Sequence, residues 1–360
     1  MIVEPPNSPL EPGPNRPPNA RWLLNLLPLL LIGLGVHLLL PQIANLEKSW
    51  QTLVQMTWWL VALAVLAQCI SYLGFGYLLA ALADMVGEHL GVRRGALITL
   101  AGGTVGLVAA GMVGSTAAVY RWTNASGVSP KTAGLCSTLP TLFNNLLLVL
   151  IAILGLSHLL VIHELTRLQA VSFSLILIFL LLLIISALYG VLHPDWLKIR
   201  LGGLQQWWGK LARRPYDHTT TENTVSWLVD TYTILRSGGW RGPALGALLN
   251  TGFDILTLYF LFLAAGHAVS PGVLLTGYGL PLLIGKVSFL PGGVGIVEAT
   301  MAAIYVSMNV PNQVIPVVIL GYRLLSFWIP ALLGIPAALY LQRVTRGTQL
   351  SQGNKGQVTP

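Results

Sequence analysis

One stretch of the sequence contains several residues that disfavour a helix: Lys286-Val-Ser-Phe-Leu-Pro291-Gly292-Gly293-Val-Gly295-Ile-Val-Glu298. Pro291 cannot donate a backbone hydrogen bond, and the three glycines that follow it weaken the helical preference of the chain. We therefore expect a loop with open backbone N–H groups, followed by a helix that begins near Ile296. Such a helix N-terminus attracts anions, for example a phosphate.

This break lies within a strongly apolar chain. Hydrophobic residues make up 54% of the 360 positions and charged residues only 9%, whereas a soluble domain carries about 25% charged residues. The mean hydropathy is +0.71. Because so few charges cannot cover a water-soluble surface, the composition indicates a polytopic membrane protein. A span needs roughly 20 apolar residues, so the length allows about eight to ten spans and little soluble material.

The net charge of +8 does not indicate nucleic-acid binding, because Lys and Arg collect in the cytoplasmic loops of membrane proteins. Cys69 and Cys136 form no metal-spaced cluster, and His158 and His163 are poorly spaced for a metal. The sequence contains no Walker lysine loop, no Gly-x-Ser-x-Gly and no kinase motif set. We therefore expect no metal, no cofactor and no catalytic residue, and no motif supports ATP-driven pumping or serine hydrolysis.

Six apolar runs have the length of full spans: 22–40, 57–83, 132–160, 168–192, 242–265 and 312–341. The Pro-rich residues 1–20 cannot hold a helix and predict a disordered tail. The short, mixed segment Leu46–Met56 is typical of an interfacial segment. The stretch 193–241 is polar, basic and interleaved with tryptophans, which favours a loop that lies on anionic lipid.

Residues 95–120 are interrupted by glycines instead of forming a clean span: Gly102, Gly103, Gly106, Gly111 and Gly114. If this segment crossed the bilayer once, the basic loop 193–241 would lie outside, against the positive-inside rule. If it is a re-entrant hairpin, the basic segments all lie in the cytoplasm, and Lys48 and Arg167 are the only Lys or Arg residues in the outer segments. The charges therefore predict a re-entrant hairpin.

A second broken region spans 271–309 and contains the Pro-Gly-Gly stretch. The charge distribution is equally satisfied by a second hairpin, entered from outside, and by two tilted helices. Broken segments that enter from opposite faces, one in each half, indicate an inverted repeat. Such breaks occur at membrane depth only where they are buried in protein or line a wet cavity. In transporters they point to the substrate site, although close helix packing is an alternative reason for the glycines.

The sequence therefore predicts an all-α polytopic membrane protein with about six full spans plus two broken or re-entrant segments. We expect one membrane domain over 21–342, with cytoplasmic tails at 1–20 and 343–360. The first repeat covers about 57–192 and the second about 242–342, and the cytoplasmic loop 193–241 joins them.

Lys286 and Glu298 flank the break inside an apolar run, where an ionisable group costs at least ~2.5–3.5 kcal/mol. They either pair with each other and hold the hairpin together, or serve a lipid headgroup or an ion in a wet cavity. The three consecutive departures from helix chemistry favour the second role. In that case Lys286→Met and Glu298→Gln should each abolish movement of the substrate across the membrane while the fold stays nearly intact. The double variant should stay inactive.

Other charged residues in apolar helices are candidates for the same site. The depth of Arg323 favours an inward-facing partner, such as Glu298 or a phosphate. Asn250 and Asp254 are one turn apart and share a helix face. An acid at that depth suggests coupling to a proton or cation, with a structural hydrogen bond as the alternative. We expect the substrate to be bound by Arg121, Lys286, Pro291, Gly292, Gly293, Gly295, Glu298 and Arg323.

The pattern Pro-Gly-Gly-x-Gly-x-x-Glu at 291–298, followed by Tyr322-Arg323 in the next helix, resembles the transmembrane domain of lysylphosphatidylglycerol synthases. That family includes the flippase half of the multiple-peptide-resistance factor. The resemblance covers about residues 22–342 and is strongest in the second half. In the first half Gly111-x-x-Gly114 and Arg121 match, but no acid stands between them, and the chain has Asn144-Asn145 where relatives carry a charged pair.

The resemblance implies a membrane domain that moves a phospholipid or a lipid-linked substrate across the bilayer. We expect no soluble aminoacyl-transfer domain, because the 360 residues leave no room for one. The expected location is the cell membrane, with both termini in the cytoplasm and an anionic lipid as the partner. The alternative is an accessory subunit or a membrane transferase related to lipid-modifying enzymes, with a separate enzyme docked on the loop 193–241.

The topology can be tested by cysteine labelling. Cysteines introduced at Ser126 and at Asn223 should both react only from the cytoplasmic side, because the hairpin brings the chain back to the face it entered. If Ser126→Cys is labelled from outside while Asn223→Cys is not, the re-entrant interpretation of 95–120 is wrong.

Overall fold

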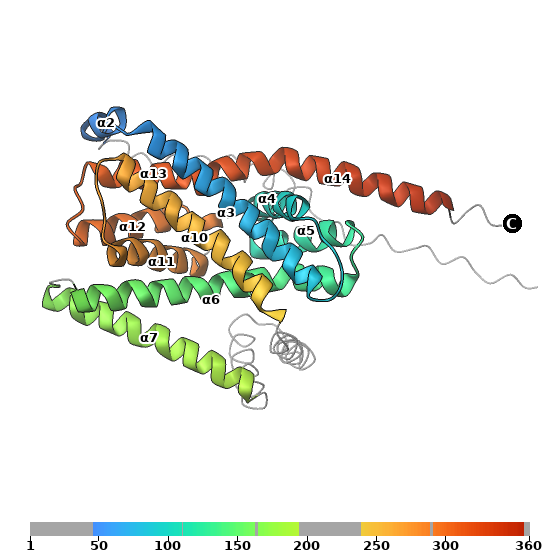
Figure 1. The fold of residues 1–360 in the computed structure, drawn as a ribbon, viewed down its shortest axis with the longest axis horizontal. Helices are drawn as coiled ribbons and strands as arrows, with labels where there is room; N and C mark the ends of the chain where they lie inside the picture. Colours follow the sequence, from blue (N-terminus) through green and yellow to red (C-terminus); the bar gives the residue numbers. More distant parts are fainter. Residues whose placement is uncertain (1–45, 110, 163–164, 194–238, 289–290, 356–360) are drawn as a thin grey trace, which may run out of the picture.

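A computed structural model describes residues 46–109, 111–162, 165–193, 239–288 and 291–355, and the regular elements in these residues are all helices (Figure 1). Five helices of this part are long and apolar enough to cross a membrane. The all-α polytopic prediction is therefore confirmed. The tail 1–20, the apolar run 22–40 and most of the loop 193–241 lie outside the described residues.

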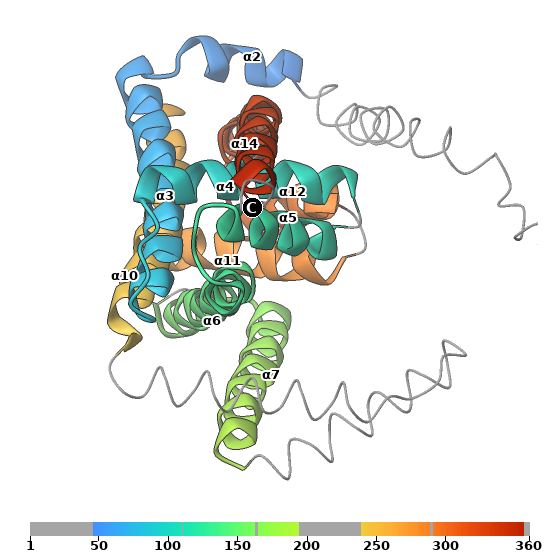
Figure 2. The ribbon, with the colours of Figure 1, turned by 90° about the vertical axis from the view of Figure 1, so that its right-hand side faces the viewer.

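The five long helices agree with the predicted spans to within a few residues. They are α3 (Trp58–Asp84), α6 (Pro130–Ile162), α7 (Arg167–Leu192), α10 (Arg241–Ala264) and a final run whose candidate span is Val314–Thr345. The final run comprises α13 (Val314–Arg323), the π-helical turn η3 (Leu324–Trp328) and α14 (Ile329–Lys355). The short helix α2 (Leu46–Val54) precedes α3 where the sequence predicts an interfacial segment. Figure 2 shows α7 at the edge of the bundle, where it packs on α6.

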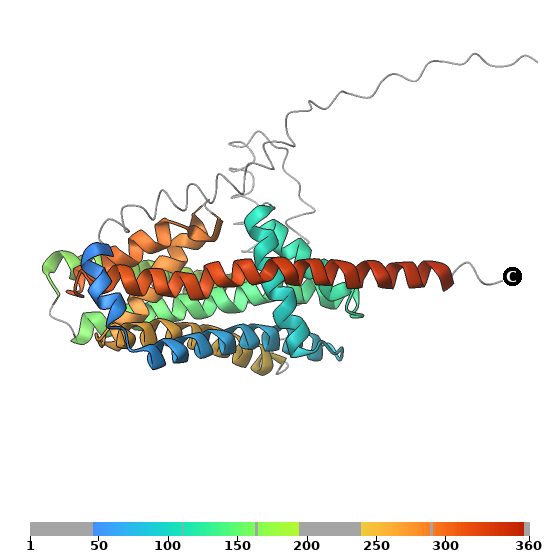
Figure 3. The same ribbon diagram turned by 90° about the horizontal axis from the view of Figure 1, so that it is seen from above.

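Helices α3 and α10 run antiparallel and pack along each other at one edge of the bundle (Figure 3). Their backbones approach so closely that a Cβ atom on Gly74 would lie 2.7 Å from the backbone nitrogen of Asn250. A Cβ atom on Gly246 would likewise lie 2.6 Å from Cα of Leu78. The Ser71 hydroxyl donates to the Asn250 carbonyl at 2.8 Å, which adds a polar contact at membrane depth.

The first broken segment folds into a helical hairpin made of α4 (Val92–Val108) and α5 (Met112–Asn124). Gly111 at the turn has φ +59°, a left-handed conformation that favours glycine. The two ends of the hairpin return to one side, because the Ser129 amide donates to the Glu88 carboxylate at 2.6 Å. The hydrogen bonds from Ser129 lower the pKa of the Glu88 carboxyl. A helical hairpin is therefore present in the segment for which the sequence predicts a re-entrant one.

The second broken segment is also a hairpin, formed by α11 (Pro271–Val287), the turn η2 (Pro291–Gly293) and α12 (Ile296–Ser307). Its arms contain 17 and 12 residues. At 1.5 Å per residue these arms are about 25 and 18 Å long, too short to cross an apolar layer of about 30 Å. The structure therefore favours the hairpin over two tilted spans.

The two hairpins enter the bundle from opposite ends (Figure 1). The Thr57 amide, just before α3, donates to the Ala264 carbonyl at 2.9 Å, so the end of α10 and the start of α11 lie at the N-terminal end of α3. Glu88 and the first hairpin follow the C-terminal end of α3. The packing is reciprocal, since α6 contacts α11 and α14 contacts α4. In each contact a hairpin from one half of the chain packs on a long helix from the other half. This arrangement is expected of an inverted repeat.

The last helix continues beyond the predicted span. The predicted span ends at 341 with a polar tail after it, whereas α14 continues to Lys355. Figure 3 shows this helix extending beyond the rest of the bundle. The added residues include Arg, Gln and Leu, which favour helix, and no proline interrupts them.

The close approach of α3 and α10 can be tested with two glycines on one helix. Gly246→Ala should destabilise the protein by about 1–3 kcal/mol, because the new methyl group would overlap the Leu78 backbone. Gly252→Ala is the matched control, since a Cβ atom there meets nothing within 4 Å. Thermal unfolding in one detergent measures both. Equal melting temperatures for the two variants would contradict the packing described above.

Candidate functional site

The tip of the second hairpin lies near the middle of the bundle. Along α11, a Cβ atom on Gly279 would lie 3.0 Å from Ala152 of α6. Nearer the tip, the Lys286 ammonium donates to the side-chain oxygen of Asn145. Asn145 is close to the centre of the 33-residue helix α6, so Lys286 lies at about mid-depth of that helix. The Pro-Gly-Gly turn follows immediately.

The glycines of the turn are required by its backbone. Gly292, Gly293 and Gly295 have φ values of +64°, +64° and +85°, which side-chain-bearing residues rarely adopt. A Cβ atom on Gly292 would also lie 2.1 Å from the Phe327 ring. Helix α12 begins at Ile296, as the sequence predicts.

The anion at the start of α12 is the protein's own Glu298. Its carboxylate accepts a hydrogen bond from the Gly295 amide at 2.6 Å and pairs with Arg323 Nε at 2.6 Å. Arg323 Nη2 donates to the Gly292 carbonyl at 2.9 Å, and the guanidinium lies 4.4 Å from the centre of the Phe327 ring. Glu298 and Arg323 are only 1% and 4% exposed. The expected inward partner of Arg323 is therefore Glu298.

The structure corrects the two roles that the sequence allowed for Lys286 and Glu298. They do not pair with each other, because Glu298 is held by Arg323 and Lys286 by Asn145. Nor do they share one wet cavity, because Glu298 is buried whereas Lys286 is exposed. The two residues therefore belong to different environments, and their substitutions should have different effects.

A groove of about 100 Å³ lies beside the tip, between α3, α4, η3 and α14. Tyr72, Thr99, Thr104 and Ser326 give it polar groups, and Phe327 separates it from the Pro-Gly-Gly turn. The Tyr72 hydroxyl donates to the Ser326 carbonyl at 3.0 Å. Ser326 lies in the π-helical turn, and such turns in an α-helix are frequent at functional sites.

The remaining predicted residues lie apart from the tip. Arg121 is exposed in the last turn of α5, toward the open end of the first hairpin. The predicted convergence of Arg121, Lys286 and Arg323 on one phosphate is therefore not present in this arrangement. Asn250 donates to the Ser71 carbonyl and hydroxyl at 3.1 and 3.0 Å, which is a contact between scaffold helices.

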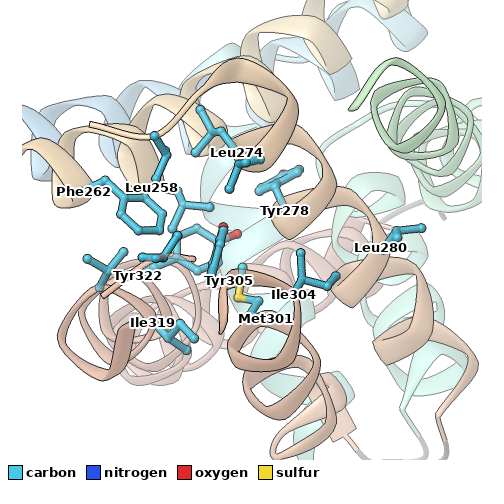
Figure 4. Close-up of a cluster of buried hydrophobic side chains, with 14 of the residues drawn as sticks. Leu258, Phe262, Leu274, Tyr278, Leu280, Met301, Ile304, Tyr305, Ile319 and Tyr322 are labelled. Atoms are coloured by element: carbon cyan, nitrogen blue, oxygen red, sulfur yellow. The ribbon is translucent and has the colours of Figure 1, made fainter. Parts of the chain in front are cut away.

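Asp254 is the centre of a second polar cluster. Its Oδ2 accepts hydrogen bonds from the hydroxyls of Tyr278 and Tyr322, each at 2.8 Å, and the Gln68 side chain adds another hydrogen bond. Figure 4 shows the two tyrosines among the apolar side chains of α10–α13. Sequence reasoning missed Tyr278, Gln68 and Phe327. Tyr278 could have been noticed, because a buried tyrosine hydroxyl in an apolar run needs a polar partner.

In the described part of the chain, no three His, Cys, Asp or Glu side chains gather in a way that could hold a metal ion.

The buried ion pair generates a stability prediction. Glu298→Gln or Arg323→Met should each cost about 3–5 kcal/mol, because one charge stays buried without its partner. The double variant should recover most of this loss. Lys286→Met is the matched control and should unfold near the wild-type temperature, since Lys286 is exposed. Thermal unfolding measures all four proteins. Rescue of Glu298→Gln by Lys286→Met, and not by Arg323→Met, would contradict the observed pairing.

Comparison with known proteins identifies the family. The family model described as the lysylphosphatidylglycerol synthase TM region matches residues 25–334. Among curated proteins, a UPF0104 membrane protein of Pyrococcus horikoshii is 36% identical over 83 residues, which is 23% of this chain and 25% of the relative. One from Methanocaldococcus jannaschii is 36% identical over 91 residues, or 25% and 27% of the two chains. One from Methanothermobacter thermautotrophicus is 35% identical over 88 residues, or 24% and 26%.

These matches to individual relatives cover about a quarter of each relative's length. The family model, in contrast, covers both hairpins and all five described candidate spans over most or all of their length. The chain is therefore an integral, multi-pass membrane protein that belongs to the lysylphosphatidylglycerol synthase TM region family.

Proposed function

We propose that this protein translocates a phospholipid, or another anionic lipid-linked substrate, across the bilayer. The observation that carries the proposal is the position of Lys286 at the tip of a broken hairpin. It is exposed at about mid-depth, and the one side-chain hydrogen bond found for it among the described residues is to the neutral Asn145. A charge in the apolar layer costs at least ~2.5–3.5 kcal/mol unless water or a counter-charge compensates it. A lipid phosphate supplies that counter-charge.

The positions of the other two candidate cations strengthen the case for Lys286. Arg323 is neutralised by Glu298 and further held by the Gly292 carbonyl, so it has little capacity for a ligand. Arg121 lies toward the open end of the other hairpin. Lys286 is therefore the cation best placed to attract a phosphate at mid-depth.

The surrounding architecture supports passage of an amphiphile. The hairpins enter from opposite ends, and the first arm of one, α4, contacts the turn η2 of the other. The groove beside them has polar side chains at a depth where lipid tails supply none. Broken helices around a mid-depth site are the arrangement found in secondary transporters. We place this activity in the cell membrane, with both termini in the cytoplasm.

Reconstitution tests the proposal. The purified protein in liposomes, without nucleotide or a partner protein, should transfer a headgroup-labelled phosphatidylglycerol between leaflets faster than protein-free liposomes do. Lys286→Met should slow this transfer at least about tenfold, equivalent to about 1.4 kcal/mol, because the phosphate loses its counter-charge. Lys286→Arg should retain most of the rate.

Lys131→Met is the matched control, because Lys131 is also exposed on a helix but lies in the first turn of α6, far along that helix from Asn145. It should transfer lipid at the wild-type rate. Transfer that appears only after a partner enzyme is added would favour the accessory-subunit alternative. Equal rates for Lys286→Met and the wild type would exclude the proposed role of Lys286.

A further inference from the structure

Asp254 is a carboxylate inside the membrane domain whose hydrogen-bond partners are neutral. Tyr278 and Tyr322 donate to Oδ2, and Gln68 adds a side-chain hydrogen bond. These three side chains are 3%, 1% and 6% exposed. In the described part of the chain Asp254 forms no ion pair, whereas Glu298 has Arg323. The burial of an unpaired carboxylate is costly, and a bound proton removes that cost.

A second observation concerns Gln68. Its Oε1 is a buried acceptor without a hydrogen-bond partner among the described residues. The Gln68 side chain also interacts with the Asp254 carboxylate, and only its amide nitrogen can donate a hydrogen bond to a carboxylate. Rotation of this amide by 180° would present Oε1 instead, which can accept a hydrogen bond only from a protonated acid. The cluster therefore offers hydrogen bonds to both protonation states of Asp254.

From this geometry we propose that Asp254, Gln68, Tyr278 and Tyr322 form a proton-binding site that couples proton movement to lipid translocation. A proton from water forms an O–H bond at Asp254 and leaves a neutral acid. No other bond is made or broken. The Asp254 residue as a whole is only partly buried.

The site connects the parts that would have to move. Asp254 and Gln68 belong to the scaffold helices α10 and α3, Tyr278 to the second hairpin, and Tyr322 to the helix that carries Arg323. Hydrogen bonds to a charged acceptor are roughly twice as strong as those to a neutral one. Protonation of Asp254 therefore weakens the attachment of α11 and α13 to the scaffold.

The titratable groups around Asp254 are few. Tyr72 of α3, Tyr278 of α11, and Tyr322 and Arg323 of α13 interact with it electrostatically. Arg323 is held by Glu298. No titratable side chain of α6 interacts with Asp254 in the described part, although that helix also packs on α10. A pH response of this cluster is therefore attributable to Asp254.

Proton binding can be measured without any transport. Infrared difference spectra of the protein in phosphatidylglycerol and phosphatidylethanolamine nanodiscs, recorded between neutral and acidic pH, should show the C=O band of a protonated acid inside the protein in addition to the bands of exposed carboxyl groups. Asp254→Asn should abolish this band. Glu298→Gln, if it folds, should retain it. A band that is unchanged in Asp254→Asn, or is missing from the wild type, overturns the proton site.

Tyrosine variants keep the test decisive if Asp254→Asn does not fold. Tyr278→Phe and Tyr322→Phe each remove one hydrogen bond to the carboxyl, so each should shift the frequency of the band. Tyr305→Phe is the matched control, because the Tyr305 hydroxyl is buried nearby without a partner among the described residues (Figure 4). If none of the three variants shifts the frequency of the band, the band does not come from Asp254 and the proposal fails.

The coupling part rests on the proposed lipid translocation and has its own test. In liposomes with a pH gradient of one unit, one proton per lipid would sustain about a tenfold difference in labelled lipid between leaflets. The Asp254→Asn variant should instead bring the labelled lipid to equal amounts in the two leaflets. Transfer by the wild type without any such difference would overturn the coupling. A proton band without lipid transfer would overturn both translocation and coupling, and would leave the proton site supported.

Discussion

The buried ion pair between Glu298 and Arg323 holds together the part of the molecule on which the site depends. It joins α12 to α13, and through the Gly292 carbonyl it also fixes the turn between the two arms of the second hairpin. The turn needs three residues with positive φ, and glycines supply them. Because both charges are buried, the pair stabilises the tip only while both partners are present.

This pairing divides the polar groups at mid-depth into two classes. Glu298 and Arg323 satisfy each other and shape the backbone. Lys286 and Asp254 instead have neutral partners, an asparagine in one case and tyrosines and a glutamine in the other. A membrane interior tolerates such groups only with water, a ligand or a proton. The second class is therefore where we locate substrate binding and coupling.

The scaffold explains how these groups come to the same depth. Glycines let α3 and α10 pack backbone to backbone, and each half inserts a short hairpin from its own end. Short arms bring their turns to the middle of the bundle, where α4 and η2 meet. The groove that contains Tyr72 and Ser326 lies beside this meeting point. The architecture thus supplies backbone breaks and polar side chains at a depth that a continuous span would fill with apolar residues.

The sequence by itself determined the elements whose signals are local. Runs of apolar residues marked the five described spans, glycines marked the first hairpin, proline and glycines marked the second, and Gly295 marked the start of α12 at Ile296. Only the tertiary structure decided the partners. Arg323 and Glu298 are 25 positions apart, and Lys286 and Asn145 are 141 apart, so each pair depends on the register between helices. Close glycine contacts such as that of Gly279 with Ala152 set that register, and hydropathy does not encode which helix faces which. The sequence therefore identified Lys286, Glu298, Arg323 and Asp254 as unusual, while packing alone assigned them to a stable pair, an exposed cation and a candidate proton site.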